Sequence, residues 1–139
     1  MEFITDRTKA DVLQGTAKGF YGAEDLNRVE SAVKELVELV KPFGINKQIE
    51  TKTDWDFPEV FSADKWPTKE QMARYINNVH IICGAVDMAA GLPNTMERLT
   101  WDGANQIEIA LQNAYKRVRK TIENIRYSGE IFAEEESYL

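Results

Sequence analysis

Two side chains with strong ligand and nucleophile chemistry lie one helical turn apart in this sequence. His80 and Cys83 are the only histidine and the only cysteine, and a spacing of three places them on one face of a helix. A zinc site needs about four ligands, and beyond these two the sequence offers only carboxylates. We therefore interpret Cys83 as a small buried apolar residue and His80 as the edge of a buried stripe, and we expect no metal site.

A second concentration of reactive groups is the acidic segment that contains Asp54, Asp56, Glu59 and Asp64. These carboxylates lack the ligand spacing and the central glycine that bend a calcium loop around its ion. A carboxylate pair could also hydrolyse a glycosidic bond, but an acidic protein supplies such pairs by chance. We rank a hydrolase last among the functions considered, and we expect no catalytic residue and no cofactor.

The overall charge excludes other classes of partner. The 139 residues include 17 basic and 23 acidic side chains, for a net charge of −6. A nucleic-acid-binding protein normally needs a basic face to displace counterions, so we expect no nucleic acid partner. No apolar run approaches the roughly 20 residues of a membrane span, and the first residues do not have the pattern of a signal peptide. We therefore expect no membrane partner and a cytoplasmic site of synthesis.

The periodicity of the apolar residues predicts the elements that position these groups. It indicates a short helix over 7–14 capped by Thr5 or Asp6, and long helices over 23–41, 68–91 and 102–126. We predict a single all-α domain, 1–139, in which the three main helices form an up-down bundle with the short N-terminal helix. The residues 45–67 have no helical period and form a long ordered connection, with a short strand possible at 49–55.

The first long helix has a clear division between an apolar and a polar side. Its apolar stripe consists of Leu26, Val29, Val33, Leu36, Val37 and Val40. Arg28 and Glu30 fall outside this stripe, and we place them on the solvent-exposed side together with Lys34, Glu35 and Glu38. Inside the second long helix, Gly84 costs about 1 kcal/mol relative to alanine, which either a close helix–helix approach or simple tolerance explains.

Helix caps and asparagines supply the candidate structural residues. Thr68 and Gln71 fit a capping box, and Thr100 is placed to cap the last helix. Three strings put an asparagine two residues before a stripe position: Asn27-Arg28-Val29-Glu30, Asn77-Asn78-Val79 and Asn105-Gln106-Ile107-Glu108. Asparagine is a poor mid-helix residue, so we predict that Asn27, Asn78 and Asn105 make tertiary hydrogen bonds, for example to the backbone of the long connection. The alternative is that the recurrence of these strings is a coincidence.

Terminal arms and one basic cluster are the candidate interfaces. The arms 1–5 and 127–139 contain Phe3, Ile4, Ile131 and Phe132, whose apolar side chains are costly to leave in water. They pack either on their own bundle or on a neighbouring subunit. The cluster on the last helix consists of Lys116, Arg117, Arg119 and Lys120. It is either a solvated helix face or a docking patch for an acidic protein surface, such as the acidic tail of another subunit.

Seven short strings of mixed composition are distributed over nearly the whole chain, and the order in which they follow one another is specific. They are Thr5-Asp6-Arg7-Thr8, Asp25-Leu26-Asn27-Arg28-Val29-Glu30, Thr51-Lys52-Thr53-Asp54-Trp55, Gln71-Met72-Ala73-Arg74-Tyr75, Met96-Glu97-Arg98-Leu99-Thr100-Trp101, Gly103-Ala104-Asn105-Gln106-Ile107-Glu108 and Tyr127-Ser128-Gly129-Glu130. With these blocks in this order, the chain resembles a family of small proteins encoded in the tail-structure regions of phages and prophages of Firmicutes-type bacteria.

The resemblance implies a virion structural protein of the tail, in its baseplate or fibre region, without catalytic activity. Its partners would be other virion or tail proteins and further copies of itself, in the virion and, before assembly, in the host cytoplasm. Asp54, Trp55, Thr100 and Trp101 would then be structural, supplying a helix N-cap, a tryptophan anchor and loop-to-helix hydrogen bonds. The alternative is a prophage-encoded soluble binding or regulatory protein that acts on a host factor.

Overall fold

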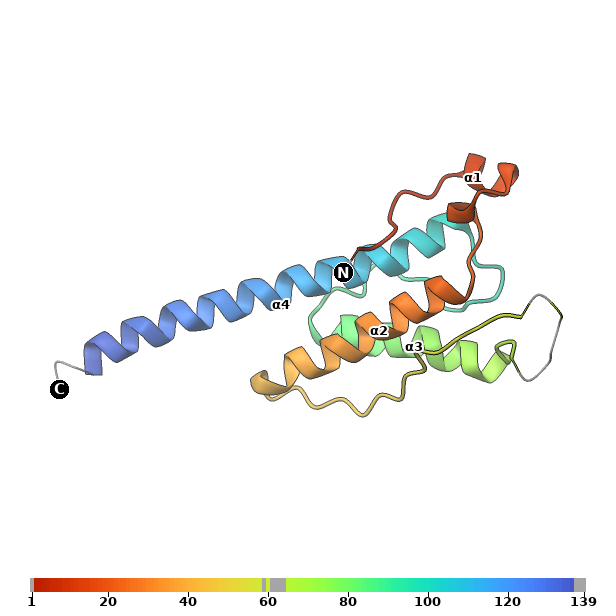
Figure 1. Ribbon diagram of the computed structural model, residues 1–139. Coiled ribbons are helices and arrows are strands. Elements are labelled where there is room, and N and C mark those ends of the chain that lie inside the picture. Colours follow the sequence, from red (N-terminus) through yellow and green to blue (C-terminus); the bar gives the residue numbers. More distant parts are fainter. Residues whose placement is uncertain (1, 59, 61–64, 137–139) are drawn as a thin grey trace.

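The computed structural model describes a helical protein in which three long helices pack side by side (Figure 1). It describes the residues 2–58, 60 and 65–136, with side chains up to residue 124. Within these residues the elements are helices, and none is a strand, so the predicted all-α class is confirmed. The helices are α1 (Lys9–Gln14), α2 (Ala23–Val40), α3 (Lys69–Ala85) and α4 (Trp101–Glu136), with the 3-10 turns η1 (Ala17–Gly19) and η2 (Lys41–Phe43).

The three long helices all run in the same direction, which differs from the predicted up-down arrangement. Near their N-terminal ends, Arg28 of α2 binds Glu108 of α4. One cavity at the other end is lined by Val40 of α2, Ala85 of α3 and Val118 of α4. Each connection therefore returns the chain to the starting end, as Figure 1 shows.

The connections are long enough to make this return. A helix of 17 or 18 residues, such as α3 or α2, is about 27 Å long at 1.5 Å per residue. If fully extended, a connection as long as the residues 86–100 could span about 50 Å, and one as long as the residues 44–68 could span more. The up-down prediction assumed that consecutive helices reverse direction, a rule that holds for short loops.

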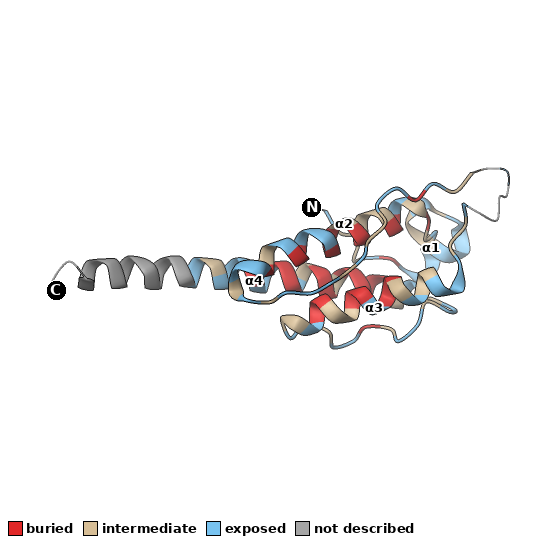
Figure 2. Cartoon of the chain, turned by 90° about the horizontal axis from the view of Figure 1, so that it is seen from below, coloured by how far each residue is buried: buried red, intermediate tan, exposed pale blue. Residues whose placement is uncertain are grey.

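The core lies between α2, α3 and α4 and is built from the predicted stripes (Figure 2). The buried residues are Leu26, Val29, Val33, Leu36, Val37 and Val40 from α2, Tyr75, Ile76, Val79, Ile82 and Cys83 from α3, and Ala104, Ile107, Leu111, Ala114, Tyr115 and Val118 from α4. Burying one such large aliphatic or aromatic side chain contributes about 1.5–3 kcal/mol. Trp55 from the connection completes the core at 4% exposure.

The observed helix ends agree in part with the helix caps predicted from the sequence. Thr68 and Gln71 form the predicted capping box, and the Thr100 hydroxyl accepts the Gly103 N–H at 2.9 Å. Helix α1 begins later than predicted, because Thr8 is its cap in place of Thr5 or Asp6. Helix α3 ends at Ala85, before the predicted residue 91, since Asp87 adopts a left-handed conformation with φ of 61°.

Gly84 lies on an open face of α3, where a Cβ atom would meet nothing within 4 Å. A close helix–helix approach therefore does not explain this glycine. The backbone of α4 continues beyond the predicted end near Arg126, so the predicted arm 127–139 is helical up to Glu136 (Figure 1).

Candidate functional site

An N-terminal clamp holds the residues 4–7 against α2 and α4; it consists of Asn105, Glu108, Arg28 and Asp25. Asn105 binds both backbone groups of Arg7: its Oδ1 accepts the Arg7 N–H at 3.0 Å and its Nδ2 donates to the Arg7 carbonyl at 2.9 Å. Glu108 accepts the Ile4 N–H at 3.1 Å. The side chains of α4 therefore satisfy backbone groups of an extended segment that has no neighbouring strand.

The same clamp encloses four charged side chains. The Nη2 of Arg7 donates to Glu108 at 2.6 Å and to Asp25 at 3.0 Å. Arg28 also donates to both carboxylates, at 2.6 Å in each case. The side chains of Arg7 and Glu108 are only 2% and 0% exposed. Two positive and two negative charges balance here, which avoids the large cost of an unpaired buried charge.

Electrostatics in the clamp favour the charged state of Arg28. Partial burial disfavours its guanidinium, but the hydrogen bonds to Glu108 and Asp25 outweigh that effect and raise the pKa of Arg28. The carboxylate of Asp25 also accepts the Gly22 N–H at 2.8 Å, at the start of α2. The cluster therefore fixes the first turn of α2 as well as the N-terminal segment.

A connection clamp, which consists of Asn27, Glu30, Arg74 and Asn78, holds the residues 50–55 against α2 and α3. Asn27 binds both backbone groups of Trp55, accepting its N–H at 2.7 Å and donating to its carbonyl at 2.8 Å. Glu30 accepts the Lys52 N–H at 3.0 Å and the indole N–H of Trp55, and it pairs with Arg74 at 2.8 Å. The segment predicted as a possible strand is thus extended backbone held by helix side chains.

The third predicted asparagine belongs to the connection clamp. Asn78 of α3 donates to the Glu50 carbonyl at 2.8 Å, and Arg74 donates to the same oxygen. All three asparagines therefore make the tertiary hydrogen bonds that the sequence predicts. Asn27 and Asn78 bind the long connection, whereas Asn105 binds the N-terminal segment.

Both clamps use the same spacing, an asparagine followed three residues later by a glutamate. The pairs are Asn27 with Glu30 on α2 and Asn105 with Glu108 on α4. In each pair the asparagine binds one extended residue through its backbone, and the buried glutamate binds a further backbone N–H and an arginine from a neighbouring helix. A spacing of three places both side chains on one helix face, which is why one helix can hold one extended segment.

The clamp glutamates and arginines are the residues that the sequence reasoning missed. Arg28 and Glu30 were expected on the solvent-exposed side of the first long helix, but Glu30 is 2% exposed and Arg28 is half-buried. The prediction was wrong because the extended segments cover that side of α2, and periodicity alone does not show what covers a polar face. The repeated Asn-x-x-Glu spacing was the available signal.

Two tyrosines join the regions of the two clamps. The hydroxyl of Tyr21, which precedes α2, forms a hydrogen bond with the hydroxyl of Tyr75 on α3, and the guanidinium of Arg7 lies 5.5 Å from the centre of the Tyr21 ring. Burial is the main cause that raises the pKa of both tyrosines, and the carboxylate of Glu108 raises it further. Burial also raises the pKa of the Cys83 thiol to about 12, which keeps it protonated at neutral pH.

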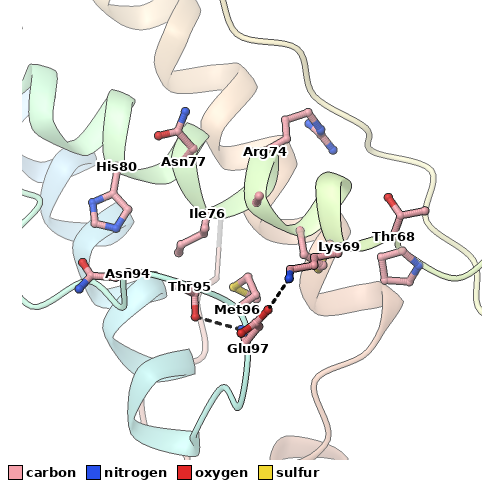
Figure 3. Close-up of a pocket in the computed structure, with 13 residues that line it drawn as sticks. Thr68, Lys69, Arg74, Ile76, Asn77, His80, Asn94, Thr95, Met96 and Glu97 are labelled. Carbon is pink, nitrogen blue, oxygen red and sulfur yellow. Dashed lines mark hydrogen bonds and ion pairs between the residues drawn. The ribbon is translucent and has the colours of Figure 1, made fainter.

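A cavity of about 880 Å³ lies between α3 and the residues 93–97 (Figure 3). Its apolar wall is formed by Met72, Ile76 and Met96, and an ion pair of 3.4 Å between Lys69 and Glu97 lies at its edge. His80, which the sequence places at the edge of the buried stripe, lines this cavity, and its Nε2 lies 2.8 Å from the Pro93 carbonyl oxygen. This contact positions the connection between α3 and α4.

An exposed apolar surface lies where α1 faces the start of α4. This α1 surface consists of Val12, Leu13, Leu99 and Trp101, with exposures of 48% for Val12 and 77% for Leu13. It encloses a hollow of about 380 Å³, with Arg7 and Lys9 among the lining residues. Helix α1 buries none of its own residues, and Figure 2 shows it at one end of the bundle.

The predicted interface residues fall into three groups. Phe3 and Ile4 are half-buried on their own chain, and the Phe3 ring lies 5.8 Å from that of Tyr115, so this arm is not free to reach a neighbour. The basic residues Lys116, Arg119 and Lys120 are exposed on α4. The side chains of Ile131 and Phe132 lie outside the described residues.

The two tryptophans of the predicted structural set behave differently. Trp55 is a buried anchor, whereas Trp101 is 37% exposed and lines the hollow beside α1. Asp54 pairs with Lys52 at 2.8 Å at the surface and makes no hydrogen bond to a helix among the described contacts. The neighbouring Lys52 lowers the pKa of Asp54 through a hydrogen bond and its charge.

The remaining candidates are described in part. Of the acidic segment, Glu59 and Asp64 lie outside the described residues. In the part of the chain that the structure covers, no three histidine, cysteine or acidic side chains come together as a possible metal site. Over the same residues, no helix combines the length and apolar character needed to cross a membrane.

Comparison with known proteins adds no assignment to this geometry. No protein-family model, no curated protein and no solved structure matches the chain.

Proposed function

We propose that this chain is a structural protein of a phage tail, in its baseplate or fibre region, that assembles through protein–protein contacts and performs no catalysis. The proposal places it in the virion, and in the host cytoplasm before assembly. Its partners are other tail proteins and further copies of the chain.

The main support for this proposal is that the buried charged residues hold the framework of the protein together. Among the residues whose side chains the structure describes, the buried charged ones are Arg7, Asp25, Glu30 and Glu108, and each binds an opposite charge and positions backbone or a neighbouring helix. The same residues belong to the strings that resemble the phage tail family. The resemblance therefore covers the residues that hold the framework together, as expected for a protein whose function is its shape.

The α1 surface gives a second line of support. Contiguous exposed apolar side chains on a small protein typically mark a place where another protein binds. Val12 and Leu13 are 48% and 77% exposed, and both line the same hollow. A tail component needs such surfaces, because it is held in the particle by contacts with its neighbours.

Mass spectrometry of purified particles tests the proposal. Particles from an induced lysogen that carries the gene are expected to contain the chain in a fixed ratio to a known tail protein. A strain with the gene deleted is the control, and it is expected to yield defective tails. Particles that lack the chain while the cell extract contains it would contradict the proposal and favour the alternative, a regulatory protein that binds a host factor.

A further inference from the structure

The cavity between α3 and the residues 93–97 is lined by an asparagine with the same spacing as those of the two clamps. We propose that this cavity binds an extended, uncharged stretch of polypeptide from a neighbouring tail protein, with Asn77 holding its backbone and its apolar side chains entering the cavity. The inference deepens the proposed function and rests on it for the source of the partner. Binding itself is a property of the free protein, so a solution measurement tests it separately.

The cavity has the size and the lining of a binding site. Its volume of about 880 Å³ falls within the range of about 300–1,000 Å³ that is typical of ligand pockets. Met72, Ile76 and Met96 form its apolar wall, and methionine side chains adapt to partners of different shape. The lining residues of α3 extend from Lys69 to His80, a length of about 16 Å. An extended chain rises about 3.3 Å per residue, so about five residues cover this length.

The charges at the cavity are already balanced within the chain, which favours an uncharged ligand. Lys69 pairs with Glu97 at 3.4 Å at the edge of the cavity, as Figure 3 shows. Arg74, which also lines the cavity, pairs with Glu30 at 2.8 Å. A charged ligand would have to compete with these ion pairs or leave its own charge without a partner. A peptide backbone brings hydrogen-bonding groups and no charge.

Asn77 resembles the clamp asparagines in its position. It lies inside α3, where asparagine is disfavoured, and it is exposed at the rim of the cavity (Figure 3). Asn27 and Asn105 also lie inside helices, and each binds the backbone N–H and carbonyl of one extended residue. The side chain of Asn77 makes no hydrogen bond within the described part of the chain. A peptide backbone supplies both the donor and the acceptor that this amide can bind.

His80 takes the place of the clamp glutamates, three residues after the asparagine. As with Asn27 and Glu30, this spacing puts Asn77 and His80 on one helix face, and both line the cavity. The Pro93 carbonyl can only accept a hydrogen bond, so the Nε2 of His80 donates to it. In a neutral imidazole the Nδ1 atom is then an acceptor, as a glutamate carboxylate is. The pair therefore offers an extended backbone the same two kinds of group as each clamp does.

Methyl NMR of the full chain tests the binding. The probe is a capped pentapeptide, acetyl-Leu-Thr-Leu-Thr-Leu-amide, which is uncharged and places its leucines on one face when it is extended. With the methionine methyl groups labelled, the signals of Met72 and Met96 are expected to shift on titration. The signal of Met88, which does not line the cavity, should stay in place. The peptide acetyl-Leu-Leu-Leu-Thr-Thr-amide has the same composition without the alternation and should bind more weakly.

Asn77→Ala tests the recognition of the backbone. The variant deletes two hydrogen bonds to the peptide, so we expect the dissociation constant to rise about tenfold. Because the Asn77 side chain is exposed and makes no hydrogen bond within the described part of the chain, the variant should keep its circular dichroism spectrum. Asn113→Ala removes an exposed asparagine of α4 that does not line the cavity. It is the matched control and should bind like the wild type.

Three results would overturn the inference. They are methyl signals of Met72 and Met96 that do not shift up to the solubility limit of the peptide, equal affinities of the wild type and Asn77→Ala, and equal affinities for the two peptides. A chain that does not bind the peptide but is present in purified particles would leave the proposed function standing. A chain that binds the peptide but is absent from the particles would overturn the tail protein as its partner.

Discussion

The two clamps solve the same structural problem with different amounts of charge. Each uses an asparagine and a buried glutamate, three residues apart, to hold an extended segment on a helix. The segment in the N-terminal clamp brings the guanidinium of Arg7, which is 3% exposed. The segment in the connection clamp brings the neutral indole of Trp55, which donates to Glu30. The N-terminal clamp therefore needs an additional carboxylate, Asp25, to balance its charge.

This difference in charge determines how much stability is lost when a side chain of each clamp is removed by mutation. Breaking a buried ion pair leaves a charge without a partner in a region of low dielectric constant, which costs about 3–5 kcal/mol. Breaking a hydrogen bond to a neutral group costs only the desolvation of that group, about 1–3 kcal/mol. The N-terminal clamp should therefore be the more sensitive of the two, although both have the same design.

The largest expected effect is that of Glu108→Ala. It removes one of the two carboxylates that balance Arg7 and Arg28, and it leaves the Ile4 N–H without its acceptor. We expect the free energy of unfolding, measured by urea denaturation, to fall by about 3–5 kcal/mol. A loss below about 1 kcal/mol would show that the buried charges do not contribute as proposed.

Glu30→Ala makes the matching change in the connection clamp. It leaves the Trp55 indole and the Lys52 N–H unsatisfied, but its partner Arg74 has a side chain that is 24% exposed and can recover water. We expect a loss of about 2 kcal/mol in the same urea experiment. A loss equal to or greater than that of Glu108→Ala would contradict the distinction between the two clamps.

The asparagines allow the comparison to be made without charge. Asn105→Ala and Asn27→Ala each delete two hydrogen bonds to the backbone of one extended residue. We expect each to cost about 1–2 kcal/mol, with the larger value for Asn105 because its contacts are fully buried. If the two losses are equal within error, burial of the backbone groups does not distinguish the clamps.

Alkaline pH should destabilise the fold through the tyrosine pair. The pKa values of Tyr21 and Tyr75 are raised above 10 in the folded protein, so the unfolded chain releases these protons first. The stability is therefore fully present below pH 10 and falls as the pH rises above it. Thermal melts between neutral and alkaline pH should show this fall, and Tyr75→Phe should reduce it; an unchanged slope in that variant would assign the effect to other groups.

The smallest effect is expected at the surface of the connection segment. Asp54 is mostly exposed, and its partner among the described ion pairs is Lys52, which is also partly exposed, so solvent screens the interaction. Asp54→Asn should leave the urea midpoint unchanged within error. A measurable loss would restore the structural role that the sequence first indicated for this residue.

The sequence predicted the elements better than their arrangement. The apolar spacing of three and four located α2, α3 and the first part of α4, because a helix buries one face whatever its neighbours are. The direction of the helices could not be read from it, since that depends on the paths of the two long connections. Similarly, Glu30 looked solvent-exposed because nothing local shows that the residues 50–55 cover it.

The candidate site was predictable to a similar degree. Asn27, Asn78 and Asn105 stood out because asparagine is disfavoured inside helices, and they are the residues that hold extended backbone. The α1 surface gave no such signal: a short helix with two apolar residues is ordinary in sequence. Only the folded chain shows that Leu13 is left in solvent.

The contact between Arg7 and Glu108 joins residues 101 positions apart, and it orders events during synthesis. At roughly 5–20 residues per second, a ribosome needs about 5 to 20 seconds to reach the second residue after the first. During that interval Arg7 and Arg28 have no Glu108 to bind, and the residues 4–7 have no α4 to pack against. The beginning of this chain is therefore among the last parts of it to fold, and any nascent fragment shorter than the start of α4 lacks the N-terminal clamp.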